Sequence, residues 1–184
     1  MCLPIGDGAA AVLMCSVDYL KKLPPAVQNR AVKIKASTFT GGMYKKFDEP
    51  SLCYVAAKKA YAMAGISPED IDLAEVHDAT SFGVIYQSEM MGFCEIGQGG
   101  RFVESGATTL EGKKPINTSG GLVSKGHPVG ATGLSMIYEL TAQLRGEAGP
   151  RQIKNAELAM QENGGGVIGT EEAACSVIIL QKDR

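Results

Sequence analysis

The spacing of apolar residues changes along the chain between the two-residue period of strands and the longer period of helices. Residues 32–36 alternate three apolar residues with two lysines, which predicts a strand with one exposed face. Continuous short apolar runs are typical of strands that are buried on both faces. On this ground we predict a buried strand at residues 175–180, and two further short strands are predicted at residues 73–76 and 157–160.

Helices are predicted between these strands, and residues that disfavour helix mark where they end. A short helix over residues 17–23 is expected to stop at Pro24-Pro25, because proline interrupts the backbone hydrogen bonds of a helix. Residues 48–51 offer capping side chains for a helix over residues 52–64, which Gly65 is expected to end.

Two further helices complete an alternation of strands and helices. Apolar residues at helical spacing predict one helix from Phe82 to Met90, directly after the strand at residues 73–76. A second helix is expected to end at Gly146 and to carry on one face Leu134, Ile137, Thr141 and Leu144. The alternation predicts an α/β domain in which helices cover a mixed β-sheet.

The first fifteen residues depart from this pattern. Asp7-Gly8 leads directly into residues 9–15, a continuous apolar run that predicts a strand buried on both faces. Such a strand needs neighbours, and a self-sufficient domain seldom begins with one. This is the first indication that the chain is part of something larger.

Composition limits the classes of protein to consider. The chain has 184 residues, of which 45% are apolar and 21% are charged, both near the average of globular domains. It has no run of the roughly 18 apolar residues that a membrane span needs and no secretory leader, so we expect a cytoplasmic protein without membrane contact. Its net charge is -2 and its Lys and Arg residues are scattered, which argues against nucleic-acid binding.

The chain has five cysteines, which are Cys2, Cys15, Cys53, Cys94 and Cys175. Their number is odd and no two have CxxC spacing, which argues against a disulfide framework and against a zinc site. Free cysteines are among the most buried residue types. We therefore expect reduced, buried thiols.

Both histidines of the chain lie in sequence contexts that suggest chemistry. His77 lies between a predicted strand and a predicted helix, and His127 lies between Gly126 and Pro128, just before a predicted helix. The dipole at a helix N-terminus disfavours the imidazolium cation, so a histidine there tends to be neutral and able to act as a base or hydrogen-bond donor. A structural role is the alternative for either histidine alone, but two of two in such contexts favour a functional role.

A third candidate element is the sequence Gln-Glu-Asn-Gly-Gly-Gly at residues 161–166, between two predicted strands. Backbone N–H groups of consecutive glycines can converge on one small volume, as in an oxyanion hole. The alternative is a flexible turn. The segment lacks the order of a P-loop, and residues 97–100 do not open an obvious helix after a strand, so neither is interpreted as a nucleotide-binding motif.

Residues 117–133 follow the pattern NxxGGxxxxGHPxGAxG, with every fixed position met. This pattern resembles the GHP signature of thiolases. Residues 77–80, His-Asp-Ala-Thr, are similar to the HDCF or HDAF motif of the lipid-transfer-protein-type and archaeal thiolases, where classical thiolases have NEAF. Residues 92–100 and 143–149 also resemble that branch, and residues 7–11 resemble the DGAAA strand that closes the first half of the thiolase fold.

The resemblance implies half of a five-layered αβαβα thiolase fold. It covers nearly all of the chain but only the second half of a thiolase, so residues 1–15 are expected to be the last strand of the N-terminal half and residues 16–184 the C-terminal domain. The nucleophilic cysteine of the family lies upstream of the DGAAA strand, and none of the cysteines here is in its context. The resemblance therefore implies that an N-terminal half, in the same or a separate chain, supplies the nucleophile.

By position, the resemblance assigns roles to three residues. His127 matches the histidine that helps to activate the nucleophilic thiol and donates a hydrogen bond to the thioester oxygen. His77 matches the residue that completes this oxyanion hole, where the enolate charge of the Claisen step develops. Gly165 matches the glycine of the CxG motif, whose backbone N–H helps to stabilise the tetrahedral intermediate.

Two positions depart from the family pattern, and both concern proton transfer. Classical thiolases have an acid/base cysteine where this chain has Asn163, and the lipid-transfer branch is thought to place it where this chain has Ala79. Neither side chain exchanges a proton as a thiol does. Glu162 and Asp78 are nearby carboxylates that could take this role, or that could instead be solvated or paired. Thr80, in place of the family's phenylalanine, could reshape the acyl pocket.

The function expected from the resemblance is that of the C-terminal portion of an acyl-CoA acyltransferase, which cleaves 3-ketoacyl-CoA by thiolysis or forms it by Claisen condensation. Acyl-CoA and coenzyme A would be substrates, with no tightly bound cofactor and no metal. The expected partners are the N-terminal half, further copies of the chain, and a small zinc-ribbon/OB-fold companion. Two alternatives stay open: a retro-aldolase acting on β-hydroxyacyl-CoA, and a non-catalytic subunit that acts as a scaffold or binds lipid-like acyl groups.

Overall fold

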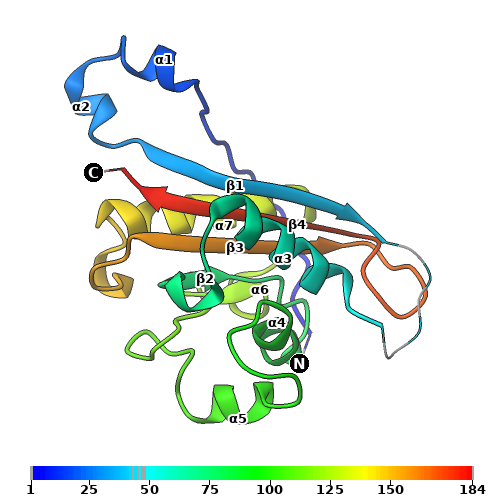
Figure 1. Ribbon diagram of the computed structural model, residues 1–184. Coiled ribbons are helices and arrows are strands. Elements are labelled where there is room, and N and C mark those ends of the chain that lie inside the picture. Colours follow the sequence, from blue (N-terminus) through cyan, green and yellow to red (C-terminus); the bar gives the residue numbers. More distant parts are fainter. Residues whose placement is uncertain (1, 43, 45, 47–48, 184) are drawn as a thin grey trace.

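The computed structural model describes residues 2–42, 44, 46 and 49–183, and Figure 1 shows their arrangement. The strands in these residues are β1 (Val32–Gly41), β2 (Leu73–Glu75), β3 (Leu158–Gly165) and β4 (Ala174–Lys182). The α-helices are α1 (Val17–Leu20), α2 (Pro25–Gln28), α3 (Leu52–Ala64), α4 (Gly83–Met90), α5 (Gly99–Glu104), α6 (Gly121–Lys125) and α7 (Val129–Arg145). Two short 3-10 helices are η1 (Pro68–Asp70) and η2 (Gly149–Arg151).

The strands form one mixed sheet in the order β1-β4-β3-β2. β4 is antiparallel to both of its neighbours, whereas β2 runs parallel to β3. Because β2 and β3 are parallel, they point toward the same end of the sheet, which is also where β4 begins. We refer to this end, marked by Glu75, Gly165 and Ala174, as the site edge.

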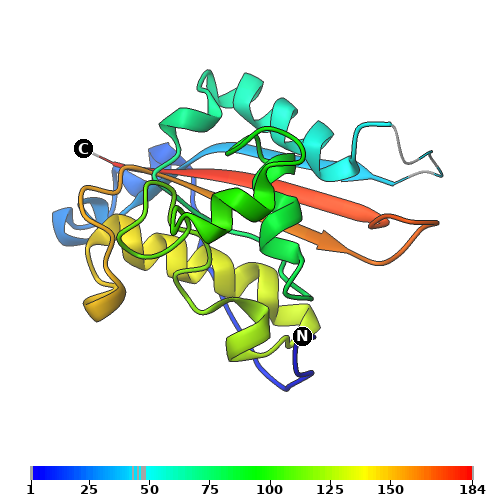
Figure 2. The same cartoon turned by 90° about the horizontal axis from the view of Figure 1, so that it is seen from below.

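Helices cover both faces of the sheet, with α3 on one face and α7 on the other (Figure 2). The two-residue period of the strands divides their side chains between two cores. The core under α3 includes Ala56, Ala60, Met160, Cys175, Val177 and Ile179. The core under α7 includes Leu73, Leu140, Leu144, Ala159 and Leu180. The predicted α/β class, with a mixed sheet between helices, is confirmed.

The predicted ends of the two long helices are confirmed. The Ser51 hydroxyl caps α3 by accepting a hydrogen bond from the Tyr54 N–H, whereas Asp48 of the predicted capping segment lies outside the described residues. Gly65 follows α3 and Gly146 follows α7, with φ of 65° and 76°. Glycine adopts this left-handed conformation without the steric cost that a Cβ imposes.

The other helices are short. α5 begins at Gly99, so residues 97–100 do open a helix. This helix follows α4 and a turn, however, and does not follow a strand. Among the residues that the structure describes, no helix has both the length and the apolar character needed to cross a bilayer.

The apolar run at residues 9–15 is not a strand in this structure, so this prediction is wrong for the chain by itself. Its side chains are mostly exposed: Leu13 lies fully in solvent and Met14 is 75% exposed. A strand needs a neighbour that pairs with its backbone N–H and C=O groups, and no described strand pairs with this segment. It runs instead as an irregular segment toward α1 and α2, near the C-terminus (Figure 1).

Three strands extend further than predicted, among them β4, which spans Ala174–Lys182. β1 continues to Gly41, and β3 includes Gly164 and Gly165, which pair with β4 where a turn was expected. Glycine generally weakens a strand because it has no side chain to pack, but Gly164 has a packing function. A Cβ at this position would overlap the carboxylate of Glu172, so the missing side chain leaves room for that residue. The turn between β3 and β4 is therefore residues 166–173.

The expectation of buried cysteines is correct for only part of the set. Cys53 and Cys175 are buried, Cys94 is half-buried, and Cys2 and Cys15 are exposed. The two buried thiols come from α3 and β4, which the fold brings together although they are far apart in the sequence.

Candidate active site

His77 and His127, which are distant in the sequence, lie side by side at the site edge. Their ring centroids are 5.2 Å apart, and the ring planes are inclined by 57°. His77 follows β2, and His127 directly precedes Pro128, the N-cap residue of α7. The structure thus brings together the two residues that the sequence singled out.

Buried polar side chains hold the segment before His127 against the end of β2. The side-chain oxygen of Asn117 accepts a hydrogen bond from the Val76 N–H at 2.7 Å. Glu75 is fully buried and accepts hydrogen bonds from the Ser119 N–H at 3.0 Å and from its hydroxyl at 2.5 Å. Lys125 forms an ion pair with Glu75 at 3.7 Å. Charge-assisted hydrogen bonds of this kind fix the position of the loop that carries His127.

The carboxylate of Asp78 is paired with a backbone group, which is one of the alternatives that the sequence left open for it. Its Oδ1 accepts a hydrogen bond of 2.6 Å from the Leu122 N–H in α6, and the side chain is buried. The left-handed Gly121 makes this approach possible, because a Cβ there would overlap the Asp78 carboxylate. Asp78 therefore connects the motif at residues 77–80 to the motif at residues 117–133.

His127 is placed as a neutral base. Its Nδ1 lies 2.8 Å from Oγ1 of Thr132, whose hydroxyl donates to the Pro128 carbonyl at 3.1 Å. Because the hydroxyl proton of Thr132 is used there, Oγ1 accepts the Nδ1–H of His127, and Nε2 is left without a proton. Burial lowers the pKa of His127, and the neighbouring His77 lowers it further. The ring is therefore suited to take up a proton at Nε2.

His77 has the opposite electrostatic environment. Its Nδ1 lies 3.5 Å from Oε1 of Glu172, and its backbone N–H donates to Oε2 of Glu162 at 2.9 Å. Burial alone would lower the pKa of His77. The hydrogen bond to Glu172 and the charges of Glu162, Glu172 and Asp78 outweigh burial, so the pKa lies above its ordinary value. The ring is therefore biased toward the imidazolium form, which donates hydrogen bonds from both nitrogens.

Glu172 is a site residue that the sequence analysis missed. It lies in the turn between β3 and β4, its side chain is 25% exposed, and it contacts both His77 and the thiol of Cys53. No local pattern distinguishes it from the adjacent Glu171, which accepts a hydrogen bond from the Leu52 N–H at the start of α3. The sequence does contain one related feature, Gly164. Its role in making room for Glu172 is evident only in the folded hairpin.

Glu162 is fully buried beneath His77. Its Oε1 lies 3.5 Å from the Sγ atoms of both Cys53 and Cys175. Burial raises the pKa of Glu162 to about 7, and the charge of Glu172 contributes in the same direction. Glu162 thus supports the backbone of His77 from the α3 side of the sheet.

Among the described residues, Cys53, Glu162 and Cys175 form a group of potential metal ligands, with donor atoms within 4.8 Å of one another. CxxC spacing could not indicate this group, because α3, β3 and β4 contribute one residue each. A metal site would require thiolates. The hydrogen bond with Cys175, burial and the charge of Glu162 instead raise the pKa of the Cys53 thiol. The chemistry of the group therefore fits protonated thiols that donate to the buried carboxylate of Glu162.

Asn163 and Gly165 lie near the end of β3, at the site edge. A Cβ at Gly165 would meet no atom within 4 Å, so its backbone borders open space. The side-chain oxygen of Asn163 is buried and receives no hydrogen bond from a described residue. The amide nitrogen of Asn163 faces α7, where a Cβ at Gly133 would lie 3.2 Å away.

Residues 2–5 lie across both histidine motifs. The Leu3 N–H donates to the Ala79 carbonyl, and the His127 N–H donates to the Pro4 carbonyl, each at 3.0 Å. The start of the described chain therefore joins the two motifs through its backbone.

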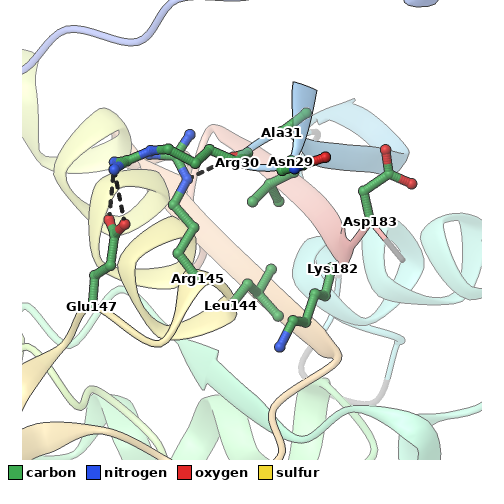
Figure 3. A pocket seen from close by; sticks show the side chains of 9 residues that line it. Asn29, Arg30, Ala31, Leu144, Arg145, Glu147, Lys182 and Asp183 are labelled. Carbon is green, nitrogen blue, oxygen red and sulfur yellow. Dashed lines mark hydrogen bonds and ion pairs between the residues drawn. The ribbon is translucent and has the colours of Figure 1, made fainter. Parts of the chain in front are cut away.

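Two surface pockets lie away from the histidines. The first is at the opposite end of β1 and β4 from the site edge, where Val32 pairs with Lys182 (Figure 3). There Arg30 forms an ion pair with Glu147 at 3.1 Å, and Arg145 donates to the Arg30 carbonyl at 2.7 Å. The second pocket is lined by Pro68, Glu69, Gly92, Phe93, Phe102, Lys113 and Lys114. Neither pocket includes a residue of the candidate site.

Comparisons with known proteins agree with the resemblance. Residues 47–181 match a family model described as thiolase C-terminal domain-like. The acetyl-CoA acetyltransferase of Methanothermobacter thermautotrophicus is 44% identical over 174 residues, which cover 92% of this chain and 44% of that protein. Sterol carrier protein 2 of Rattus norvegicus is 43% identical over 88% of this chain and 31% of its own length.

A solved structure of the Ltp2-ChsH2(DUF35) aldolase is also similar. It superimposes with a TM-score of 0.71 at 25% sequence identity, over 83% of this chain and 40% of that chain. The chain thus spans less than half the length of each of these relatives.

Proposed function

Because the chain belongs to the thiolase family, we propose that it is the C-terminal portion of an acyl-CoA acyltransferase. The reaction is the thiolytic cleavage of 3-ketoacyl-CoA, or its formation by Claisen condensation. Acyl-CoA and coenzyme A are substrates, and no tightly bound cofactor takes part. The nucleophilic cysteine that carries the acyl group comes from an N-terminal thiolase half.

The observation that carries this proposal is the pair of adjacent histidines with opposite electrostatic environments. The unprotonated Nε2 of His127 takes the proton of the nucleophilic thiol, which then attacks the acyl group as a thiolate. Once protonated, His127 donates a hydrogen bond to the thioester oxygen. The imidazolium form of His77 provides a second donor where the enolate charge develops.

β3 supplies two further groups to the same site. The backbone of Gly165 borders open space on the side where a Cβ would lie, and its N–H helps to stabilise the tetrahedral intermediate that forms when the acyl group is transferred. Asn163 occupies the position of an acid/base cysteine but has no proton to exchange, so it acts as a hydrogen-bonding group through its unpartnered oxygen.

The N-terminal segment supports an assembly with further partners. Residues 9–15 keep apolar side chains in solvent, and the sheet of an N-terminal half, in the same or a separate chain, would bury them. The assembly contains at least two copies of the chain and includes a zinc-ribbon/OB-fold companion. The name of the structural neighbour, Ltp2-ChsH2(DUF35) aldolase, fits such a multi-component enzyme.

The same neighbour favours a second candidate, the retro-aldol cleavage of a β-hydroxyacyl-CoA. This reaction needs a base for the hydroxyl proton and a donor for the enolate oxygen, and His127 and His77 offer both. It needs neither a thiol nucleophile nor an acid/base thiol, and the absence of a thiol at Ala79 and Asn163 agrees with the second point.

The test uses the complete enzyme, in which this chain is present together with the half that bears the nucleophile. Thiolysis of acetoacetyl-CoA and cleavage of a β-hydroxyacyl-CoA are measured before and after alkylation with iodoacetamide. Thiolysis that alkylation abolishes supports the acyltransferase. Cleavage of the hydroxyacyl substrate that survives alkylation supports the aldolase.

His127→Ala is expected to lower kcat/KM by about 10²- to 10⁴-fold, which is the usual contribution of a general base. Tyr138→Phe is the matched control, because Tyr138 lies on α7 with 68% of its surface exposed. Unchanged turnover in His127→Ala would overturn the catalytic assignment and leave the non-catalytic scaffold.

A further inference from the structure

We propose that Glu172 and His77 form the proton-transfer pair of this site: His77 exchanges the proton, and Glu172 orients the ring and sets its charge. The inference rests on the proposed function. It assigns to this pair the acid/base role that neither Ala79 nor Asn163 can perform, because neither side chain carries an exchangeable proton of the required acidity.

The geometry fixes Glu172 against the ring of His77. One carboxylate oxygen lies 3.5 Å from Nδ1 of His77, and the other lies 2.6 Å from Sγ of Cys53. The carboxylate also occupies the space above Gly164 that a side chain would fill. Held on these sides, Glu172 stays within reach of His77, whose side chain is only 13% exposed.

The other charged groups near His77 are engaged elsewhere. Asp78 accepts the Leu122 N–H of α6. Glu162 accepts the backbone N–H of His77 and both buried thiols, and its raised pKa, about 7, keeps it partly protonated at neutral pH. His127 faces the ring as a neutral imidazole. Of the described carboxylates, Glu172 is therefore the one that contacts the ring nitrogen of His77.

This arrangement defines which nitrogen exchanges the proton. Nδ1 of His77 faces the carboxylate of Glu172, so Nε2 is the atom left to exchange the proton. In thiolysis, the C–C bond breaks and its electron pair stays with the departing acyl-CoA as an enolate. The imidazolium gives its Nε2 proton to the carbanionic carbon of that enolate. The neutral ring then takes the thiol proton of the incoming coenzyme A, whose sulfur attacks the acyl-enzyme, and the imidazolium is restored.

Glu171 provides a matched control one position away. It belongs to the same turn, but its carboxylate accepts hydrogen bonds from the Leu52 N–H at 3.0 Å and from the Tyr86 hydroxyl at 3.3 Å. Glu171→Gln therefore tests loss of one charge in this turn without loss of the partner of His77.

The experiment compares Glu172→Gln, Glu172→Asp and Glu171→Gln in the complete enzyme. Glu172→Gln is expected to lower kcat by about 10²-fold with little change in KM, as for loss of acid/base catalysis. In this variant, the limb of the pH–rate profile that reports the ionisation of His77 should move to lower pH, because the imidazolium loses the carboxylate that stabilises it. Glu172→Asp should restore the position of that limb, and Glu171→Gln should leave both kcat and the limb unchanged.

Proton NMR titration of the chain by itself supplies a readout that is independent of turnover. The chain has only two histidines, so both ring signals can be assigned with a single His127→Ala sample. In Glu172→Gln the pKa of His77 should fall, and the pKa of His127 should rise, because a less charged His77 repels its protonated form less.

The outcomes separate this inference from the function on which it rests. A wild-type complete enzyme that catalyses neither thiolysis nor retro-aldol cleavage would overturn both. An active wild-type enzyme whose Glu172→Gln variant keeps its kcat, its pH profile and its His77 pKa would overturn the proton-transfer pair alone.

Discussion

At the scale of single residues, the surroundings of His77 and His127 give two identical side chains opposite protonation preferences. Thr132 holds His127 as a neutral ring with a free Nε2, and Glu172 biases His77 toward the cation. Enzymes commonly divide acid and base roles by giving similar groups different environments. The sequence motifs located both histidines, because each motif is a local pattern. They could not give the charge of His77, because Glu172 is distant in the sequence.

Glu162 gives a residue-scale prediction about stability. Its pKa is about 7 in the folded chain against an ordinary 4.5, so between these values the folded state binds more protons than the unfolded state. The contribution of Glu162 to the free energy of unfolding should therefore fall as pH rises through this window, by on the order of 1–3 kcal/mol. Glu162→Gln, which does not titrate, should remove this fall.

Urea denaturation at several pH values from about 5 to 8, under reducing conditions, measures the effect. Glu111→Gln is the control for the loss of one carboxylate, because Glu111 is an exposed residue. A wild-type stability that rises from acid to neutral pH relative to Glu162→Gln would contradict the assignment of a raised pKa.

At the scale of elements, the β3–β4 hairpin can hold Glu172 beside His77 because Gly164 has no side chain. Gly164→Ala introduces a Cβ where the carboxylate of Glu172 lies. The flexible end of Glu172 should move away, so the cost in unfolding free energy should stay below about 1 kcal/mol. His77 should nevertheless lose its partner, and its pKa should fall as in Glu172→Gln.

NMR titration of His77 and urea denaturation test the Gly164→Ala prediction together. Gly41→Ala is the control, because Gly41 lies in β1 at the same end of the sheet and a Cβ there would meet no atom within 4 Å. An unchanged His77 pKa in Gly164→Ala would mean that Glu172 does not depend on the space above this glycine.

The elements also show which features could be predicted from the sequence. α3 and α7 were predicted with their C-terminal glycines, because periodicity and capping are local properties. The paired glycines of β3 were not, since local propensity gave way to pairing with β4. The buried group of Cys53, Cys175 and Glu162 was missed for the same reason, because three separate elements meet there only in the folded chain.

At the scale of the whole molecule, the chain is divided into a packed α/β layer and an N-terminal segment with few contacts of its own. Among the described residues from 2 to 31, none is buried, and neither α1 nor α2 has a buried residue. Residues 2–5 are nevertheless hydrogen-bonded to both histidine motifs. The segment that reaches the site is thus continuous with the segment that presents apolar side chains to solvent.

This arrangement predicts that residues 9–15 become a strand only when a partner sheet is present. Hydrogen exchange followed by mass spectrometry should find these amides unprotected in the chain by itself, because no described strand pairs with them. In the complete thiolase they should exchange slowly, whereas amides of β4 (Ala174–Lys182) should be protected in both samples. Leu13→Asp should leave the stability of the chain by itself within about 0.5 kcal/mol of wild type, since Leu13 lies fully in solvent. The same variant should weaken assembly with the N-terminal half, because a carboxylate would then be buried between the two sheets without a partner. Protection of residues 9–15 in the chain by itself, unchanged on tenfold dilution, would show that the chain already contains their partner and would contradict this division of the molecule.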